Sequence, residues 1–256
     1  MNILTIGDVV GTQGCDFVRR HLPGFKKLKG IDLCIANGEN SAAGNGITPA
    51  SAKHLFVSGI DFITTGNHIY KRGEVYEFLD TRRDIIRPAN LYTGNPGRGT
   101  GIIDMGGTQV GVINLMGQAF MNIAENPFLC IDSLLEQLKE CHIILLDFHA
   151  EATSEKRAMG FYLDGRISVL FGTHTHVQTA DEQILPKGTG YITDLGMTGP
   201  INSVLGVTPE SSLVWLKNSM PARYEVPDVP CMLCGCIFEV DVKAKKCVSV
   251  ERICIT

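Results

Sequence analysis

Histidines that directly follow an apolar segment are the most distinctive feature of this sequence. The run RISVLFG at 166–172 has the character of a buried strand, and THTH follows it, with His174 and His176 one residue apart. Two crowded imidazoles are poorly suited to filling a core, whereas imidazole nitrogen is a common ligand of metals. A tight turn can direct each ring to a different ion. We therefore interpret His174 and His176 as metal ligands.

Four other strand-like segments also end in residues that can bind a metal. These residues are Asp8, Glu39, Asn40, Asn67, His68 and His149. Ligands of open α/β sheets bind outside the carboxyl ends of the strands, so parallel strands would bring these side chains to one edge. Carboxylate, amide and imidazole donors without thiolate suit Fe, Mn²⁺, Zn²⁺ or Mg²⁺. The sequence therefore predicts a metal site at this edge.

The supply of donors is sufficient for a pair of ions. In such a site the ions lie roughly 3.5–4 Å apart, a carboxylate bridges them, and a bound water becomes a hydroxide nucleophile near neutral pH. Each motif alone has an ordinary explanation, since a lone aspartate often caps a turn and a single histidine is usually a satisfied polar residue. The recurrence at five strand ends favours a site. The remaining histidines are interpreted as structural: His21, His54 and His142.

Alternating strand-like and helix-like segments predict an α/β fold around this edge. Strands are expected at 1–7, 31–37, 60–66, 108–115, 141–149 and 166–176, with short ones at 182–186 and 190–196. Helices are expected over 11–25, where Pro23 and Gly24 would end the helix, over 48–59, where Thr48 would be the N-cap, and over 73–83 and 126–140. Period-two alternation over 234–256 predicts a C-terminal hairpin. No repeat or linker interrupts the pattern, so we expect a single domain spanning 1–256.

Composition excludes several classes of protein. The chain has 256 residues, 44% of them hydrophobic, and a net charge of −4. This charge argues against an extended nucleic-acid surface, which usually has a basic excess. No apolar run reaches about 18 residues, so no membrane span is expected. The N-terminus resembles a first strand and not a signal peptide, which predicts a cytoplasmic protein. A homo-oligomer is neither indicated nor excluded.

The nine cysteines do not form an obvious disulfide framework, because an odd number in a chain without an export signal argues against one. The cluster CMLCGC could hold zinc or an iron–sulfur centre through Cys231, Cys234 and Cys236. The cluster also begins an alternating strand, in which cysteine serves as a small apolar residue. We favour this structural interpretation.

Five ordered motifs, GDVVG, NGEN, TGNH, FHAE and GTHTH, resemble those of the calcineurin-like metallophosphoesterases. The resemblance is closest to the bacterial YmdB-like branch of cyclic-nucleotide phosphodiesterases, and NGENSAAGNGIT, RPAN and ITDLGMTGP extend it over most of the chain. The resemblance implies a four-layer α/β/β/α sandwich, with two facing mixed β-sheets flanked by helices. The wider superfamily usually has Asp-x-His in the first motif, where this chain has Val10. In the YmdB-like pattern Asn40 supplies the missing ligand.

The resemblance also implies an allocation of roles. Asp8, Glu39, Asn40 and His176 would hold one metal, and Glu39 would bridge to a second metal held by Asn67, His149 and His174. His68 would assist the leaving group during in-line attack of metal-bound hydroxide on a small phosphodiester, a 2′,3′- or 3′,5′-cyclic nucleotide. The two ions would be Fe, Mn, Zn or Mg. Candidate substrate contacts near the motifs are Asn45, Tyr70 and Asn90.

Two other functions stay open on the sequence alone. A metal-dependent hydrolase of another bond, such as an amidohydrolase, often carries His-x-His near its first strand, whereas here the motif follows a late one. A non-enzymatic regulatory scaffold could keep the metal site to bind a nucleotide. His68 favours chemistry over the scaffold, because a sensor has no need of a proton donor.

Overall fold

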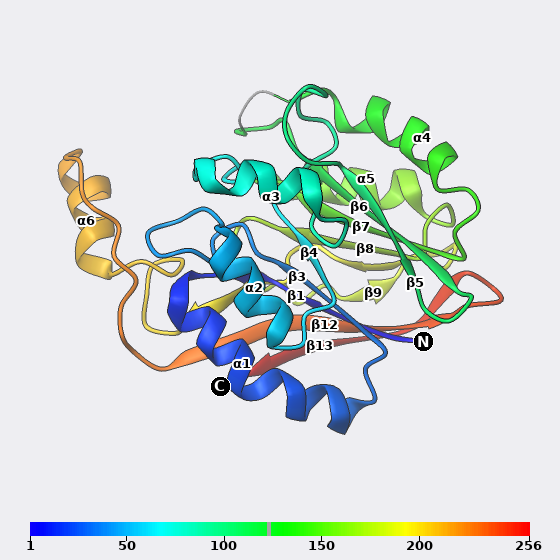
Figure 1. Ribbon diagram of the computed structural model, residues 1–256, viewed down its shortest axis with the longest axis horizontal. Helices are drawn as coiled ribbons and strands as arrows, with labels where there is room; N and C mark the ends of the chain where they lie inside the picture. The colour runs from blue at the N-terminus through cyan, green and yellow to red at the C-terminus, as the bar shows by residue number, and fades with distance from the viewer. Residues whose placement is uncertain (122–123) are drawn as a thin grey trace.

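Two β-sheets face each other in the computed structural model, which describes residues 1–121 and 124–256. Helices cover the outer faces of both sheets, so the chain is layered helix, sheet, sheet, helix (Figure 1). Each sheet contains parallel and antiparallel strand pairs. These layers confirm the predicted sandwich of two mixed sheets flanked by helices.

The first sheet has seven strands in the order β2-β11-β12-β1-β3-β4, with β13 paired to β12. Their bounds are β1 Asn2–Ile6, β2 Asp8–Val9, β3 Leu33–Asn37, β4 Phe62–Thr64, β11 Met197–Pro200, β12 Cys231–Asp241 and β13 Lys246–Ile255. Strands β1, β3 and β4 are parallel neighbours. Helices α1 (Gly11–Lys29) and α2 (Pro49–Val57) pack against this sheet.

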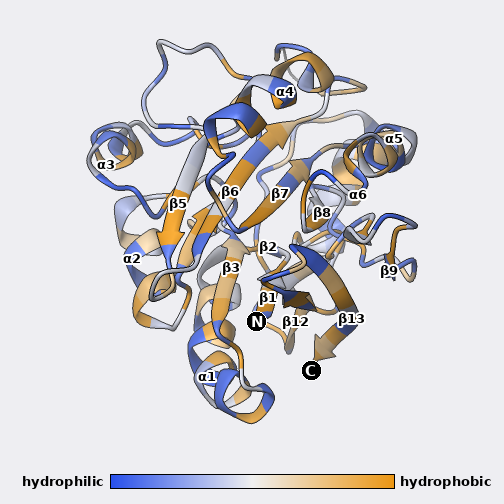
Figure 2. Ribbon diagram, turned by 90° about the vertical axis from the view of Figure 1, so that its right-hand side faces the viewer, coloured by the Kyte–Doolittle hydropathy of each residue, from blue (hydrophilic) through white to orange (hydrophobic). Residues whose placement is uncertain are grey.

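The second sheet has six strands in the order β5-β6-β7-β8-β10-β9. Their bounds are β5 Thr100–Asp104, β6 Gln109–Met116, β7 Ile143–His149, β8 Val169–Thr173, β9 Gln183–Ile184 and β10 Gly190–Ile192. Strands β6, β7, β8 and β10 are parallel. The outer face is covered by α4 (Pro127–Gln137) and α5 (Thr153–Leu163). Figure 2 shows that hydrophobic residues are concentrated on the strands.

Three apolar clusters hold these layers together. Side chains alternate along each strand, so one half of them faces the helices and the other half faces the opposite sheet. The cluster between the sheets contains Ile3, Ile35 and Phe62 from the first sheet and Leu145 and Phe171 from the second. Complete burial of such side chains contributes roughly 1.5–3 kcal/mol each before entropy is counted. The sheets are therefore locked face to face.

Pro23 does not end the first helix, contrary to our expectation. Helix α1 continues to Lys29 and ends at Gly30, whose φ of 59° gives the left-handed C-cap. Leu22 is fully buried just before the proline, and Phe25 packs against the same core just after it. Burial on both sides of Pro23 outweighs the lost backbone hydrogen bond, which costs about 3 kcal/mol in an isolated helix.

Several elements were not predicted from the sequence. These are β2, β11, α5 and α6 (Pro209–Asn218), and the segment expected as one helix over 73–83 divides into a 3₁₀ turn, η1 (Gly73–Val75), and α3 (Tyr76–Thr81). The predicted capping of α2 by Thr48 and the C-terminal hairpin are confirmed. Organisation as one domain stays a prediction. No helix of the described residues is long and apolar enough to cross a membrane.

The cysteine cluster of β12 is divided between two cores. Cys231 belongs to the cluster under the helices, whereas Cys236 belongs to the cluster between the sheets. Cys234 lies opposite Cys254 of β13, with their sulfur atoms 3.7 Å apart. Cys231 and Cys236 therefore cannot bind one ion together, which agrees with the structural interpretation.

Candidate metal centre

The residues predicted as metal ligands meet where the carboxyl ends of the two sheets converge. The first sheet contributes Asp8 at β2, Glu39 and Asn40 after β3, and Asn67 and His68 after β4. The second sheet contributes His149 at the end of β7 and His174 and His176 after β8. Short contacts join all eight side chains, and Asn40 Nδ2 at 3.4 Å from His176 Nε2 connects Asp8 and His176 to the others. The parallel strands position them as the sequence pattern predicted.

Glu39 is the centre of this network. Its side chain is fully buried, and Oε1 lies 3.4 Å from His149 Nε2 and 3.2 Å from His68 Nδ1. Oε1 also accepts a hydrogen bond from Asn40 Nδ2 at 3.0 Å, while Oε2 accepts one from the His68 backbone N–H at 2.9 Å. One carboxylate thus contacts loops from both sheets. This is the position that a bridging ligand requires.

Asp8 is the second buried carboxylate. Oδ2 accepts a hydrogen bond from the His174 backbone N–H at 3.1 Å, and Oδ1 lies 3.6 Å from His176 Nε2. Within the described part of the chain, Oδ1 is buried and has no hydrogen-bond partner. Leaving a buried carboxylate oxygen unpaired is costly. A bound cation would remove that cost, so the residues present fit a metal ion.

Hydrogen bonds at the outer nitrogens set the imidazole tautomers. His149 Nδ1 lies 2.9 Å from Thr173 Oγ1, and that hydroxyl donates to Asp147 at 2.7 Å, so Nδ1 must carry the proton. His176 Nδ1 donates to the Leu205 carbonyl at 3.0 Å. Both rings consequently present the Nε2 lone pair to the cluster. Outer partners that fix a ring in this way are characteristic of metal-binding histidines.

His174 is oriented in the opposite sense. Nε2 lies 3.0 Å from the Glu151 carboxylate, whereas Nδ1 lies 3.1 Å from His149 Nε2. The contact with Glu151 places the proton on Nε2 and leaves the Nδ1 lone pair facing inward. His149 Nε2 also lies 2.8 Å from Asn67 Oδ1. Electron-pair donors therefore converge on one point, and ligand atoms of Glu39, His149 and His174 lie within 4.8 Å of one another.

The electrostatics of the cluster also favour a cation. Burial alone would raise the pKa of Glu39, but His149 and His68 hold this pKa well below its usual value. Burial opposes a charge on His149, yet Glu39 and Asp8 raise its pKa to about 9. Burial, followed by repulsion from His149, lowers the pKa of His174 to about 4. Without a metal, the two carboxylates therefore hold a second proton on His149, while His174 stays neutral; a bound cation would take the place of that proton and free His149 Nε2 as a ligand.

A buried acid beneath the site is one feature that the sequence analysis missed. Asp147 accepts hydrogen bonds from Asn37 at 3.0 Å, Thr64 at 2.5 Å and Thr173 at 2.7 Å, so it ties β3, β4 and β8 together. Burial raises the pKa of Asp147 to about 6. An acid two residues before His149 in a buried strand was the available signal.

A second missed acid, Asp194, supports the histidine loop. Oδ2 accepts hydrogen bonds from the Thr175 hydroxyl at 2.7 Å and the Thr175 N–H at 3.2 Å, and it forms a buried ion pair with Lys156 at 2.7 Å. Oδ1 accepts from the Gly196 N–H at 2.8 Å, and the Gly196 carbonyl accepts from the Asp8 N–H at 3.1 Å. Asp194 thus positions Thr175, which lies between the two histidines, and contacts the segment beside Asp8.

A cavity of about 400 Å³ opens in front of the network. Glu39, Asn40, His68, His174 and His176 line it. The side chain of His68 is 26% exposed, and Nδ1 lies 2.9 Å from Asn40 Oδ1, so Nε2 is the ring nitrogen left for a substrate. Glu151, which was not predicted as a site residue, also lines this cavity.

Of the three candidate substrate contacts, Asn45 alone lines this cavity. Tyr70 donates its hydroxyl to the Pro96 carbonyl at 2.8 Å, and the Asn90 amide is buried between the Met116 and Glu125 carbonyls. The structure therefore gives Tyr70 and Asn90 structural roles away from the cavity. Their proximity to the motifs in sequence did not make them part of the cavity, because their side chains satisfy neighbouring backbone instead.

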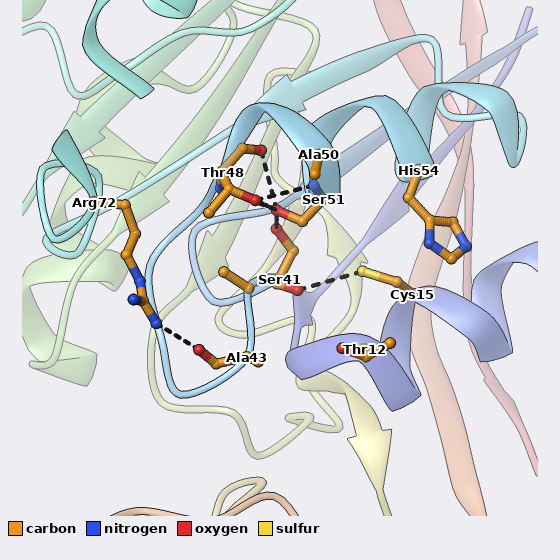
Figure 3. Close-up of a pocket in the computed structure, with 10 residues that line it drawn as sticks. Thr12, Cys15, Ser41, Ala43, Thr48, Ala50, Ser51, His54 and Arg72 are labelled. Atoms are coloured by element: carbon orange, nitrogen blue, oxygen red, sulfur yellow. Dashed lines mark hydrogen bonds between the residues drawn. The ribbon is translucent and has the colours of Figure 1, made fainter. Parts of the chain in front are cut away.

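Hydrogen bonds from Arg72 and Ser41 hold the loop that carries Asn45. These two residues also line a second cavity, of about 410 Å³ (Figure 3). Arg72 Nη2 donates to the Ala43 carbonyl at 2.5 Å and Nε donates to the Asn45 carbonyl at 3.0 Å. Ser41 donates to Ser51 at 2.9 Å, which ties the loop to the first turn of α2. These bonds hold the residues that follow Asn40.

Two facing mixed sheets with a carboxylate and imidazole cluster at their common edge have the fold and the arrangement of donors that the resemblance to calcineurin-like metallophosphoesterases implies. A 5′-nucleotidase precursor from Thermus thermophilus shares this fold, with a TM-score of 0.60 at 12% identity over 100% of this chain and 54% of that one. A family model described as YmdB-like protein matches residues 4–253. The chain belongs to the YmdB-like family.

Two relatives resemble the chain over almost its whole length. The 2′,3′-cyclic-nucleotide 2′-phosphodiesterase of Bacillus subtilis (strain 168) is 46% identical over 256 residues, which cover 100% of this chain and 97% of that protein. A crystal structure of a novel phosphatase from Mycoplasma pneumoniae has a TM-score of 0.95 at 35% identity, over 100% of this chain and 93% of that one. These matches confirm the resemblance inferred from the five motifs.

Proposed function

We propose that this protein is a metal-dependent phosphodiesterase that hydrolyses 2′,3′-cyclic nucleotides. The observation that carries the proposal is the convergence of eight polar side chains around the buried Glu39, five of which line an open cavity. The name of the Bacillus subtilis relative supports the substrate class. Its 46% identity extends over the whole chain, so the comparison covers every strand end that carries a donor.

Two ions fit the donor set. Asp8, Asn40 and His176 would hold one ion, and Asn67, His149 and His174 would hold the other, with Glu39 between them. The unpaired Asp8 Oδ1 and the inward lone pairs of the three imidazoles support this division. Fe, Mn, Zn and Mg are all compatible with oxygen and nitrogen donors. When bound, such ions neutralise phosphoryl oxygens and lower the pKa of coordinated water.

The protein's own contribution to the reaction is orientation and proton transfer. The backbone and Nδ1 of His68 are fixed by Glu39 and Asn40, which directs Nε2 into the cavity. His68 can then give a proton to the leaving alkoxide as the ring of the cyclic phosphate opens. General acid catalysis of this kind contributes about 10²–10⁴-fold in rate. Neighbouring Asn67 contacts His149 instead, so adjacent residues of one turn have separate roles.

A combined metal and activity measurement tests the proposal. The protein is purified without chelator, metals per chain are counted by mass spectrometry, and hydrolysis of bis-p-nitrophenyl phosphate, 2′,3′-cyclic AMP and 3′,5′-cyclic AMP is assayed with Mn²⁺. We expect about two ions per chain and turnover of the 2′,3′ isomer. His174→Ala should lose both metal and turnover, since it removes an inward lone pair.

His21→Ala is the matched control, because His21 stacks on Phe17 in α1 and lies outside the network. It should keep metal and activity. Bound metal without turnover of any diester would replace the proposal with a nucleotide-binding scaffold. Preferred hydrolysis of 3′,5′-cyclic AMP would keep the reaction class and change the substrate.

A further inference from the structure

The cavity at the metal centre has two chemically different walls. Predicted metal ligands and His68, together with Asn45, Glu151 and Thr175, give one part of the lining its polar character, and another part is apolar. The apolar wall consists of Val10, Leu205, Val207, Tyr224 and Val226. Apart from Val10, these residues belong to the segment 201–230, which joins β11 to β12 and carries α6 away from the two sheets (Figure 1). The sequence analysis gave this segment no role.

The segment 201–230 contacts the metal centre directly. The Leu205 carbonyl accepts the hydrogen bond from His176 Nδ1 at 3.0 Å. Gly206 has a φ of 96° and packs so closely on Val10 that an added Cβ would lie 2.7 Å from Val10 Cγ1. Backbone bonds of 2.8 and 3.1 Å between Val204 and Val207 close this turn. The apolar wall is therefore held at a fixed distance from His176.

Tyr224 is held at the mouth of the cavity by the same segment. The Thr208 N–H donates to the Glu225 carbonyl at 2.8 Å, which holds the irregular segment carrying Tyr224 beside Val207. Tyr224 is 50% exposed. It lines the site cavity and also an adjoining cavity that contains Arg223. A half-exposed ring fixed beside a reaction centre is available for stacking.

We propose that this apolar wall is the nucleobase subsite, with Tyr224 stacking on the base of the substrate. The inference rests on the proposed function, because it assumes that a cyclic phosphate lies at the donor wall. A nucleotide has one anionic end and one flat apolar end, and the two walls match these ends. Aromatic rings bind bases by stacking at roughly 1–3 kcal/mol per base. Most of the remaining lining is polar, so the base has no comparable apolar surface elsewhere among the described residues of this cavity.

The wall also predicts how selective the enzyme is among bases. Among the described residues of this wall, the Tyr224 phenol is the single polar side chain. Discrimination between bases depends on hydrogen bonds to their edges, whereas stacking tolerates every base. The 2′,3′-cyclic forms of all four nucleosides should therefore be substrates. The larger purines should have the lower KM, since they offer more surface to the ring.

Replacement of the ring tests the inference against a substrate that has no base. Tyr224→Ala should raise KM for 2′,3′-cyclic AMP about tenfold and change kcat little, which corresponds to the loss of one stacking contact. Ethylene phosphate, a five-membered cyclic diester without a base, should show no change in kcat/KM. Tyr224→Phe should restore most of the affinity for the nucleotide. Trp215→Ala, in α6 of the same segment but outside the cavity lining, controls for general disturbance of this segment.

A binding measurement separates this inference from the proposed function. Adenosine 3′-monophosphate is titrated calorimetrically into the metal-loaded wild type and Tyr224→Ala, with ethyl phosphate as the ligand that lacks a base. Weaker binding of the nucleotide alone supports the subsite even if the wild type hydrolyses no cyclic nucleotide. Equal loss for both ligands, or no loss for either, overturns the subsite even if hydrolysis is confirmed.

Discussion

The two sheets contribute different chemistry to the same cavity. The first sheet and its loops supply both carboxylates and both amides, whereas the second sheet and its loops supply three of the four imidazoles. Negative charge therefore comes from the first sheet, and most of the imidazole nitrogens come from the second. Neither sheet alone offers a complete set of ligands for two ions. The centre depends on the packing that holds the sheets face to face.

The two groups of loops are also held in different ways. Backbone hydrogen bonds fix the loops of the first sheet, including Asp8 N–H to Gly196 O at 3.1 Å and Gly11 N–H to Asn40 O at 2.8 Å. The loop of the second sheet has positive φ angles of 100° at His174 and 61° at His176. Such conformations cost about 1–3 kcal/mol each. Hydrogen bonds to the buried acids Asp194 and Asp147 offset this cost. The imidazole ligands therefore depend on side-chain hydrogen bonds in addition to backbone ones.

Removal of the Glu39 charge, which contacts residues of both sheets, should have the largest effect on metal binding and turnover. Glu39→Gln eliminates the carboxylate that contacts both sheets, so we expect loss of bound metal and more than about a hundredfold loss of diester turnover. Metal analysis and kinetics check this. Glu151→Gln is the comparison, because Glu151 is exposed and reaches the site through His174. Equal effects of the two variants would contradict a bridging position for Glu39.

His68 tests whether every side chain of the first-sheet loops acts on the metal. His68→Asn should lower kcat by about 10²–10⁴-fold while the metal content stays that of the wild type. The reason is that His68 Nδ1 contacts Glu39 and Asn40, whereas Nε2 is directed into the cavity. Loss of metal in this variant would make His68 part of the ligand set and not a proton donor.

Asp194 tests the support of the second-sheet loop. Asp194→Asn should weaken metal binding about 10–100-fold, the range expected when an outer partner is lost. Lys156→Met is the matched control, since Lys156 contacts Asp194 but neither histidine. Both variants break a buried ion pair and should lower the free energy of unfolding by about 3–5 kcal/mol.

Calorimetric titration of the metal-free proteins distinguishes these two effects. If the loop is held by Asp194 directly, metal affinity should fall far more in Asp194→Asn than in Lys156→Met. Equal losses of affinity would mean that the ion pair acts only through general stability.

The smallest effect is expected at the cysteines of β12, which lie outside both groups of loops. Cys234→Ala should keep the metal content and the turnover of the wild type, because Cys234 packs against Cys254 within the β12–β13 hairpin. Metal analysis of the purified variant is sufficient. Loss of an ion in addition to those at the site would revive the cysteine cluster as a separate metal site.

Much of this architecture could be predicted from local signals. Alternating apolar runs and polar strand ends identified the strands that carry Glu39, His149 and His174, and Thr48 identified the start of α2. Helix α5 was missed because its buried residues include the charged Lys156 and the close-packed Gly160 beside Met159 and Leu163, which together give a weak periodic signal. Pro23 was misjudged because burial of its neighbours, a tertiary effect, outweighs its local preference.

The sequence by itself determined which donor types exist and that each follows a strand. That information is local, since it depends on residue chemistry and on the period of the apolar pattern. The tertiary structure decided the division of ligands between two sheets, the support from Asp194, and the approach of residues 201–230 to Val10. These features join residues far apart in the chain, and packing of one layer against another fixes them, which no local pattern encodes.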